Sequence, residues 1–172
     1  ANGVVTPGPL ADRDDPSSDW IIGSVALFRP RKGLEVLIQA LSHLRQMGLS
    51  VRLRAVGSFE TLEYENAMKL MAEQLEVSDI IDWVGFVQEV DREFPKMDIL
   101  VLPSLFGEGM PMVILEAMAT GVPVIASNVE GIPEVLEHGQ TGLVVPPGDA
   151  KQLAVVLADL MNKKYEWQTL RK

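Results

Sequence analysis

The chain has 172 residues, of which 47% are hydrophobic and 23% are charged, and this composition indicates a globular domain rather than a disordered segment. Its formal net charge of −9 argues against nucleic-acid binding, which requires a basic face. The absence of cysteine excludes disulfides and thiolate chemistry and is compatible with the cytoplasm. No apolar run reaches the roughly 20 residues of a membrane span.

Residues 1–18 are rich in Pro, Gly, Asp and Ser, a composition typical of a linker or a loosely attached arm. A frayed terminus is the plainer interpretation. The remaining residues, 19–172, have the length of one ordinary domain.

The first predicted strand, 20–27, leads into a loop with three cations. Arg29, Arg31 and Lys32 precede a helix that is predicted over 34–47 from apolar residues at helical spacing. Cations at the carboxyl end of a strand and the start of a helix suit a pyrophosphate, for which Arg provides a fork and Lys a point charge. The alternative is that these cations are solvated surface charges.

Two further strands are predicted at 51–56 and 80–84, each followed by a helix, over 62–75 and 90–97. Gly57 directly follows the first of these strands, where an ordinary turn glycine is expected. Gly85-Phe86-Val87 follows the second strand.

The stretch 98–127 organises the chain. Residues 99–102 are an unbroken apolar run, typical of a strand buried on both faces of a parallel sheet. Pro111 suits the first turn of a helix, and Gly121 caps that helix before a second buried strand at 122–126. Strand, helix and strand form a βαβ unit, whose functional edge is the carboxyl end of the strands.

After this unit the sequence predicts a helix starting at 131, a strand at 143–145, a helix over 150–161 and the beginning of a helix at 165–172. About six parallel strands with helices on both faces make a Rossmann-like three-layer α/β/α domain, so the predicted fold class is α/β. His43 and His138 have no acidic or cysteine neighbour in the sequence and are predicted to be surface groups.

Two carboxylates flank the start of the central helix. Glu116 is the single ionisable residue of 110–121, and Glu108 precedes it by eight positions on the loop before the helix. A helix that is apolar nearly all round is predicted to be buried, where Glu116 needs either a cationic partner or ligand hydroxyls. The free N–H groups of residues 109–113 and the helix dipole form an anion site. This combination suits a ligand with both sugar hydroxyls and phosphates, such as a sugar nucleotide.

The pattern that starts at Pro103 reads Pro-Ser-x3-Glu-Gly-x-Pro-x4-Glu-Ala-Met-Ala-x-Gly-x-Pro-Val-Ile-Ala. It resembles the donor-binding signature of retaining GT-B glycosyltransferases of the group 1, or GT4-like, family. The spacing and the flanking Gly and Pro make this signal far more specific than a bare pair of Glu residues. The resemblance covers nearly the whole chain, but only the C-terminal, nucleotide-binding half of such an enzyme.

The resemblance implies a glycosyltransferase of the hexosyltransferase type, whose donor is a UDP-sugar or GDP-mannose and which needs neither a prosthetic group nor a metal. It implies that Glu108 contacts the donor sugar, that Glu116 binds the ribose hydroxyls, and that Glu108 and Lys32 have catalytic roles. The residues expected to bind the donor are Arg29, Lys32, Gly57, Val87, Glu108, Gly109, Met110, Pro111, Met112 and Glu116.

The sequence departs from the family pattern at one position. The family motif Gly-Arg-Leu-x3-Lys-Gly, aligned on Lys32-Gly33, places its Arg at Leu27, and Arg29 is predicted to replace that cation. The resemblance also implies that the backbone approaches the ligand at Gly57 and that the Gly-x-Val segment ending at Val87 flanks the nucleotide base. A core position is the alternative for Val87.

Asn2-Gly3-Val4 resembles the family's turn into its second domain, so an N-terminal domain is expected to precede this chain. That missing domain would hold the acceptor, a sugar or a lipid-linked glycan, and would make any peripheral contact with the inner face of the membrane. The isolated chain is therefore expected to bind a donor and to transfer no sugar. The resemblance also implies a cytoplasmic role in polysaccharide or glycoconjugate biosynthesis.

Three other functions compete with that of a glycosyltransferase. A nicotinamide-type dinucleotide-binding domain shares the alternation of strands and helices, but its Gly-x-Gly-x-x-Gly fingerprint fails because Met112 stands in the third position after Gly107 and Gly109. A glycosidase could use Glu108 and Glu116 as acid and nucleophile, although a buried helix is a poor place for the latter. A sugar-nucleotide-binding module without catalysis stays open.

Overall fold

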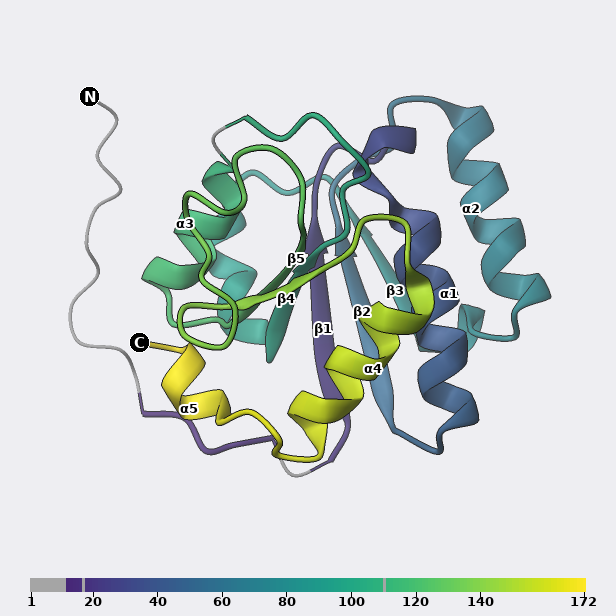
Figure 1. The fold of residues 1–172 in the computed structure, drawn as a ribbon. Coiled ribbons are helices and arrows are strands. Elements are labelled where there is room, and N and C mark those ends of the chain that lie inside the picture. The colour runs from purple at the N-terminus through teal and green to yellow at the C-terminus, as the bar shows by residue number, and fades with distance from the viewer. Residues whose placement is uncertain (1–11, 17, 110) are drawn as a thin grey trace.

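The structure is a computed structural model that describes residues 12–16, 18–109 and 111–172. These residues contain a six-stranded parallel sheet in the order β3-β2-β1-β4-β5-β6 (Figure 1). The strands are β1 (Trp20–Val25), β2 (Val51–Val56), β3 (Ile81–Gly85), β4 (Ile99–Leu102), β5 (Val124–Ser127) and β6 (Leu143–Val145). The predicted Rossmann-like parallel sheet is confirmed.

Helices cover both faces of the sheet (Figure 1). The helices α1 and α4 pack against each other on one face, with α2 beside α1, whereas α3 lies against β4 and β5 on the opposite face. The α-helices are α1 (Leu34–Gln46), α2 (Leu62–Gln74), α3 (Met112–Ala119), α4 (Ala150–Met161) and α5 (Trp167–Leu170). Short 3-10 turns at Pro30–Lys32, Ser78–Ile80, Val90–Arg92 and Phe94–Lys96 complete the connections.

The central strands are buried on both faces, because each contributes to two hydrophobic cores. Ile99 and Val101 of β4 belong to the core beneath α1 and α4, whereas Leu100 and Leu102 belong to the core beneath α3. This alternation is the period-two geometry of a strand between two layers. It explains why the strand sequence is apolar without interruption.

Three predicted helices differ in the structure. Residues 131–136 form turns instead of a helix, and Gly131 has φ +86°, with so little room that a Cβ there would lie 2.1 Å from the carbonyl oxygen of Gly109. Residues 90–97 form two 3-10 turns, the second of which contains Pro95 near its start. Proline removes a backbone donor and prevents one continuous α-helix. The last helix is also shorter than predicted, since α5 covers only part of 165–172.

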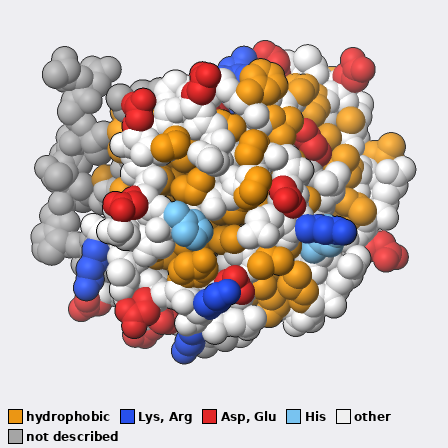
Figure 2. All heavy atoms as spheres, in the orientation of Figure 1, with side chains coloured by type: hydrophobic (Ala, Val, Ile, Leu, Met, Phe, Trp, Pro, Cys, Tyr) orange, Lys and Arg blue, Asp and Glu red, His pale blue; other side chains and the backbone are white. Residues whose placement is uncertain are grey.

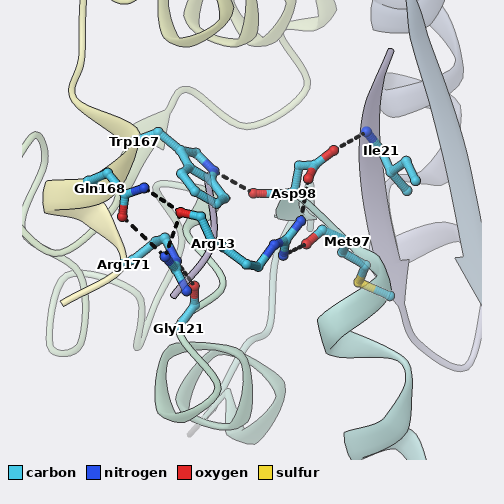
Figure 3. Close-up of polar contacts among 8 residues, drawn as sticks. All are labelled: Arg13, Ile21, Met97, Asp98, Gly121, Trp167, Gln168 and Arg171. Atoms are coloured by element: carbon cyan, nitrogen blue, oxygen red, sulfur yellow. Dashed lines mark hydrogen bonds and ion pairs between the residues drawn. The ribbon is translucent and has the colours of Figure 1, made fainter. Parts of the chain in front are cut away.

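The amino ends of the strands carry a polar cluster around Asp98, just before β4 (Figure 3). Its carboxylate accepts hydrogen bonds from the Arg13 guanidinium at 2.5 Å and from the Ile21 N–H at 2.7 Å. Arg13 also donates to the Met97 carbonyl, and the Trp167 indole N–H donates to the Asp98 carbonyl at 2.7 Å.

The same cluster joins residues 12–16 to α5. The guanidinium groups of Arg13 and Arg171 lie 5.3 and 4.8 Å from the Trp167 ring centre, and the Gln168 side chain donates to the Arg13 carbonyl. Arg171 donates to the Gly121 carbonyl. We call Arg13, Asp98, Trp167 and Arg171 the terminal clasp. The predicted arm at 1–18 lies mostly outside the described residues. Within it, Arg13 forms the hydrogen bonds to Met97 and Asp98 that Figure 3 draws.

On the face drawn in Figure 2, acidic and basic side chains are interspersed among apolar ones. None of the helices in the described residues combines the length and the apolar character needed to cross a bilayer.

Candidate functional site

The carboxyl edge of the sheet contains the point where chain connections diverge. β1 lies between β2 and β4 in the sheet. The connection after β1 leads to α1 on one face, and the connection after β4 leads to α3 on the other (Figure 1). In parallel sheets of this type, ligands bind in the crevice outside the strands at such a point.

Two predicted site residues meet at this crevice. Lys32 Nζ lies 2.7 Å from Glu108 Oε1, and the Ser104 hydroxyl donates to the same oxygen at 2.6 Å. The Glu108 side chain is 8% exposed. Burial alone would raise the pKa of Glu108, but hydrogen bonds from Lys32 and Ser104 and the charges of Lys32 and Arg31 together hold it below its usual value. Glu108 is therefore an ionised, largely buried carboxylate.

A tight contact between two loops brings Lys32 to Glu108. Gly33 has φ +69°, and a Cβ there would lie 2.0 Å from the Pro103 carbonyl oxygen, so only glycine lets the loops approach. The Leu105 N–H donates to the Arg31 carbonyl at 2.9 Å. The loop after β1 and the loop after β4 are thus joined by backbone contacts.

The structure separates the two arginines of the cationic loop. Arg31 Nη1 donates to the Gly107 carbonyl at 2.7 Å and lies 3.9 Å from Glu108 Oε1. Arg29 Nη1 lies 3.5 Å from Glu60 Oε1 instead. The structure therefore brings Lys32, Arg31 and Glu108 together, and it does not bring Arg29, the predicted substitute cation, to them.

In the sequence, α3 starts shortly after Glu108, the carboxylate of this charge cluster. The helix begins at Met112, directly after the buried Pro111, and Gly109 is exposed on the loop before it. The first-turn N–H groups of an α-helix have no partner inside the helix and attract an anion. Met110, a predicted donor-binding residue, lies outside the described residues.

The prediction that α3 is buried all round is wrong. Ile114 and Ala117 are its fully buried residues, whereas Met112 is 41% exposed and Glu116 is also exposed. Only one side of α3 packs fully against the sheet, so apolar residues such as Val113 and Met118 are only partly buried. Among the described residues, no side chain or backbone group forms an ion pair with the Glu116 carboxylate or donates a hydrogen bond to it. Partial burial and the negative charge of Asp91 raise its pKa.

An apolar pocket of about 340 Å³ lies at the carboxyl ends of the first three strands. Gly57 forms part of its floor, and a Cβ there would lie 1.8 Å from the Ala26 carbonyl oxygen. Leu27 and Phe86, which are 44% and 75% exposed, lie in its wall. The pocket thus unites the predicted residues Gly57 and Val87, and its full lining is Val25, Ala26, Leu27, Val56, Gly57, Ser58, Phe86, Val87 and Val90.

An acidic pocket of about 320 Å³ lies next to Glu108. Its lining consists of Glu108, Gly109, Glu130, Gly131 and Glu134. Carboxylates accept hydrogen bonds and cannot donate them when ionised, so such a pocket suits a ligand rich in hydroxyl groups.

Sequence reasoning missed several residues of this site. Ser104 directly follows β4 and Pro103, and Glu130 and Glu134 follow β5, so their position after buried strands was the available signal. Arg31 was recognised only as one of three loop cations. Its distinct role depends on side-chain direction, which sequence spacing does not specify.

Residues 11–172 match a family described as glycosyl transferases group 1. The chain belongs to this family. This group 1 glycosyltransferase chain is 37% identical over 143 residues to the putative colanic acid biosynthesis glycosyltransferase WcaL of Salmonella typhimurium, a match that covers 79% of the chain and 34% of the relative. It is 34% identical over 140 residues to a GDP-mannose-dependent alpha-(1-6)-phosphatidylinositol monomannoside mannosyltransferase of Mycobacterium tuberculosis, covering 77% of the chain and 36% of the relative.

A solved structure of Anabaena Alr3699/HepE in complex with UDP-glucose has the same fold. The TM-score is 0.83 at 25% identity, and the match covers 89% of this chain and 42% of that one. The predicted group 1 glycosyltransferase family and the Rossmann-like domain of the GT-B type are confirmed, so the nicotinamide-type and glycosidase alternatives are set aside. The group 1 glycosyltransferase chain spans about a third of the length of these two curated relatives.

Proposed function

We propose that this chain is the donor-binding half of a glycosyltransferase and that it binds a nucleoside-diphosphate sugar along the carboxyl edge of the sheet. The observation that carries the proposal is the 2.7 Å pair between Lys32, on the loop after β1, and Glu108, on the loop that leads into α3. A cation, a buried carboxylate and the start of a helix form a site for a ligand with phosphate and hydroxyl groups.

The two pockets give the donor its direction. The base occupies the apolar pocket with Gly57 and Val87, where a flat ring gains from burial against Leu27 and Phe86. The sugar occupies the acidic pocket, where the oxygens of Glu108 accept hydrogen bonds from its hydroxyl groups. The diphosphate bridges the two, beside Lys32 and the first turn of α3.

Glu116 binds the ribose in this arrangement. Its carboxylate has no partner of its own among the described residues, and its pKa responds to Asp91, which directly follows Val90 of the apolar pocket. A free carboxylate on that side of α3 is available to two neighbouring hydroxyl groups. Hydrogen bonds to a charged acceptor of this kind contribute about 1.5–3 kcal/mol each.

The chemistry of transfer follows from charge. When the bond between the anomeric carbon and the diphosphate breaks, negative charge grows on the phosphate oxygen. The Lys32 ammonium and the N–H groups of the α3 first turn stabilise that charge. The family resemblance supports retention of the anomeric configuration, with Glu108 and Lys32 as the catalytic residues.

The acceptor is held by another part of a longer protein. The relatives are about three times as long as their matched segment, which supports an additional N-terminal domain linked through residues 1–18. That domain would bind a sugar or a lipid-linked glycan and make any contact with the inner face of the membrane. Transfer then requires closure of the two domains around donor and acceptor, which aligns the reacting atoms and excludes water.

The donor is a UDP-sugar or GDP-mannose. The relatives point both ways, since the Mycobacterium tuberculosis enzyme is named as GDP-mannose-dependent and the Anabaena structure contains UDP-glucose. The name of the Salmonella relative, a colanic acid biosynthesis glycosyltransferase, supports a role in polysaccharide synthesis, and a cytoplasmic location is a further part of the proposal. Binding without a metal is a further part of the proposal, and titration with EDTA or with added Mg²⁺ tests it.

The proposal is tested by calorimetric titration of the chain with UDP, GDP, ADP and uridine. One nucleoside diphosphate should bind clearly, and uridine should bind at least about tenfold more weakly than UDP if the base is uracil, since the diphosphate contacts would be lost. If none of the three diphosphates binds, the proposal is contradicted.

A further inference from the structure

Arg31 joins the two loops that carry Lys32 and Glu108 through two hydrogen bonds. Its carbonyl accepts the Leu105 N–H at 2.9 Å, and its guanidinium donates to the Gly107 carbonyl at 2.7 Å. Gly107 directly precedes Glu108. Arg31 therefore fixes the backbone next to the carboxylate that the proposed donor contacts.

Arg31 keeps hydrogen-bonding capacity for a ligand. A guanidinium has five N–H donors, and the hydrogen bond to Gly107 uses one of them. Its side chain is 27% exposed and lies 3.9 Å from Glu108, so it is both near the site and accessible. A planar group with several free donors suits phosphate oxygens better than a point charge does.

The local charge balance also leaves room for an anion. Arg31 and Lys32 contribute two positive charges and Glu108 contributes one negative charge, so these three residues have an excess of one positive charge, while Glu130 and Glu134 line the adjoining acidic pocket proposed for the sugar. A diphosphate would neutralise that excess, which favours its binding.

Arg29 is committed elsewhere. It faces Glu60 at 3.5 Å, and it lines a different pocket with Pro30, Thr61 and Tyr64. Its charge is therefore balanced by a neighbouring carboxylate away from Glu108.

We propose that Arg31, and not Arg29, is the second cation of the diphosphate site and replaces the arginine that the family pattern places at Leu27. The same side chain positions Glu108 by holding Gly107. This inference rests on the proposed function, because it assumes a diphosphate ligand.

The test compares three variants of the chain with the wild type by calorimetric titration with UDP or the preferred diphosphate, and with the matching nucleoside. Arg31→Ala removes both the charge and the contact with Gly107. Arg31→Gln removes the charge but keeps a side-chain N–H for the Gly107 carbonyl. Arg29→Ala is the matched control from the same loop. Thermal unfolding of each variant verifies that it folds.

Arg31→Ala and Arg31→Gln should each weaken diphosphate binding by about tenfold or more while leaving nucleoside binding unchanged. The salt dependence of diphosphate binding should also decrease in both variants, because one charged contact is lost. Arg29→Ala should change neither property. A purely structural role would weaken nucleoside and diphosphate binding alike and would leave Arg31→Gln close to wild type.

The inference is overturned if the wild type prefers the diphosphate and Arg31→Gln retains that preference, or if Arg29→Ala causes the larger loss. Should Arg31→Ala fail to fold, Arg31→Gln alone gives the same decision. A wild type that does not distinguish diphosphate from nucleoside contradicts the proposed function itself, which is a separate outcome.

Discussion

Lys32 and Glu108 are 76 positions apart in the sequence, yet the Lys32 ammonium lies 2.7 Å from the Glu108 carboxylate. Their side chains are 17% and 8% exposed, so the pair is largely shielded from solvent. A buried pair of this kind is weak support for stability, because desolvation offsets most of the attraction. Its position at the carboxyl edge of the sheet agrees better with a ligand site.

Lys32→Ala should weaken diphosphate binding by about tenfold or more, because it removes a charge-assisted contact to phosphate. It should also destabilise the chain, since among the described residues Glu108 would keep only the Ser104 hydroxyl and the more distant Arg31 as partners. Lys69→Ala is a suitable control, because Lys69 forms a half-exposed pair with Glu65 on α2, away from Glu108. Calorimetry and thermal unfolding measure the two effects, and equal behaviour of the two variants would remove Lys32 from the site.

Acidification should expose the contribution of Glu108 to stability. Its pKa is lower in the folded chain than the value of about 4.3 expected when unfolded, so the stabilisation is present above that value and is lost as the pH falls through the folded pKa. The free energy of unfolding should therefore decrease below about pH 4.3 more steeply in the wild type than in Glu108→Gln. Parallel curves from urea denaturation would show that Glu108 is not held ionised by its neighbours.

Glu116→Gln should have the opposite effect on the free energy of unfolding. The pKa of Glu116 is raised in the folded chain, so its ionised form is disfavoured and its stabilising effect is confined to low pH. The variant should be at least as stable as the wild type at neutral pH, with the difference vanishing on acidification.

The role of Glu116 in ribose binding needs a separate measurement. The wild type should bind a ribonucleoside diphosphate more tightly than its 2′-deoxy analogue, because the Glu116 carboxylate accepts a hydrogen bond from the 2′-hydroxyl. Glu116→Ala should reduce that preference, whereas Glu63→Ala, which removes an exposed carboxylate on α2, should retain it. An unchanged preference in Glu116→Ala would place the ribose elsewhere.

Sequence analysis predicted the backbone around the candidate site because that backbone is encoded locally. The unbroken apolar run of 99–102 and the pair Lys32-Gly33 fixed a strand and a loop whose positions the structure confirms. The roles of Arg29 and Arg31 could not be separated, because a 3-10 turn at Pro30–Lys32 and a left-handed Gly33 set their opposite directions. Local spacing does not encode such directions.

The burial of α3 and the helix at 131 were mispredicted for tertiary reasons. An apolar helix sequence predicts burial, but only one side of α3 has a neighbouring layer, so Glu116 is exposed. Gly131 approaches the Gly109 backbone so closely that a turn is required there. Both features depend on contacts between distant segments.

Gly57→Ala should destabilise the chain more than Gly48→Ala. Both glycines have positive φ, at +132° and +76°, so alanine introduces backbone strain of about 1–3 kcal/mol at either position. At Gly57 the new Cβ would also lie 1.8 Å from the Ala26 carbonyl oxygen, whereas at Gly48 it would meet nothing within 4 Å. Denaturant unfolding compares the two variants, and a larger loss in Gly48→Ala would contradict the close approach at the pocket floor.

Arg13→Ala should destabilise the chain without changing nucleotide affinity, because the terminal clasp (Figure 3) includes Asp98, just before the amino end of β4, whereas the candidate site follows the carboxyl ends of the strands. The loss should be about 1–3 kcal/mol, since a charged hydrogen bond to Asp98 and the contact with Trp167 disappear. Arg52→Ala is the control, and its exposed pair with Asp82 should contribute less than about 1 kcal/mol. Equal stability of the two variants would show that the terminal clasp does not stabilise the fold.

The most direct measurement of the central claim is an NMR titration of the isotope-labelled chain with its preferred nucleoside diphosphate. Saturable shifts are predicted for the amides of Gly57, Val87, Gly109 and Met112, which surround the apolar pocket and the start of α3. The amides of Arg13 and Trp167 at the opposite edge should remain unchanged. Shifts centred on the terminal clasp, or no saturable shifts with any nucleoside diphosphate, would contradict donor binding at the carboxyl edge of the sheet.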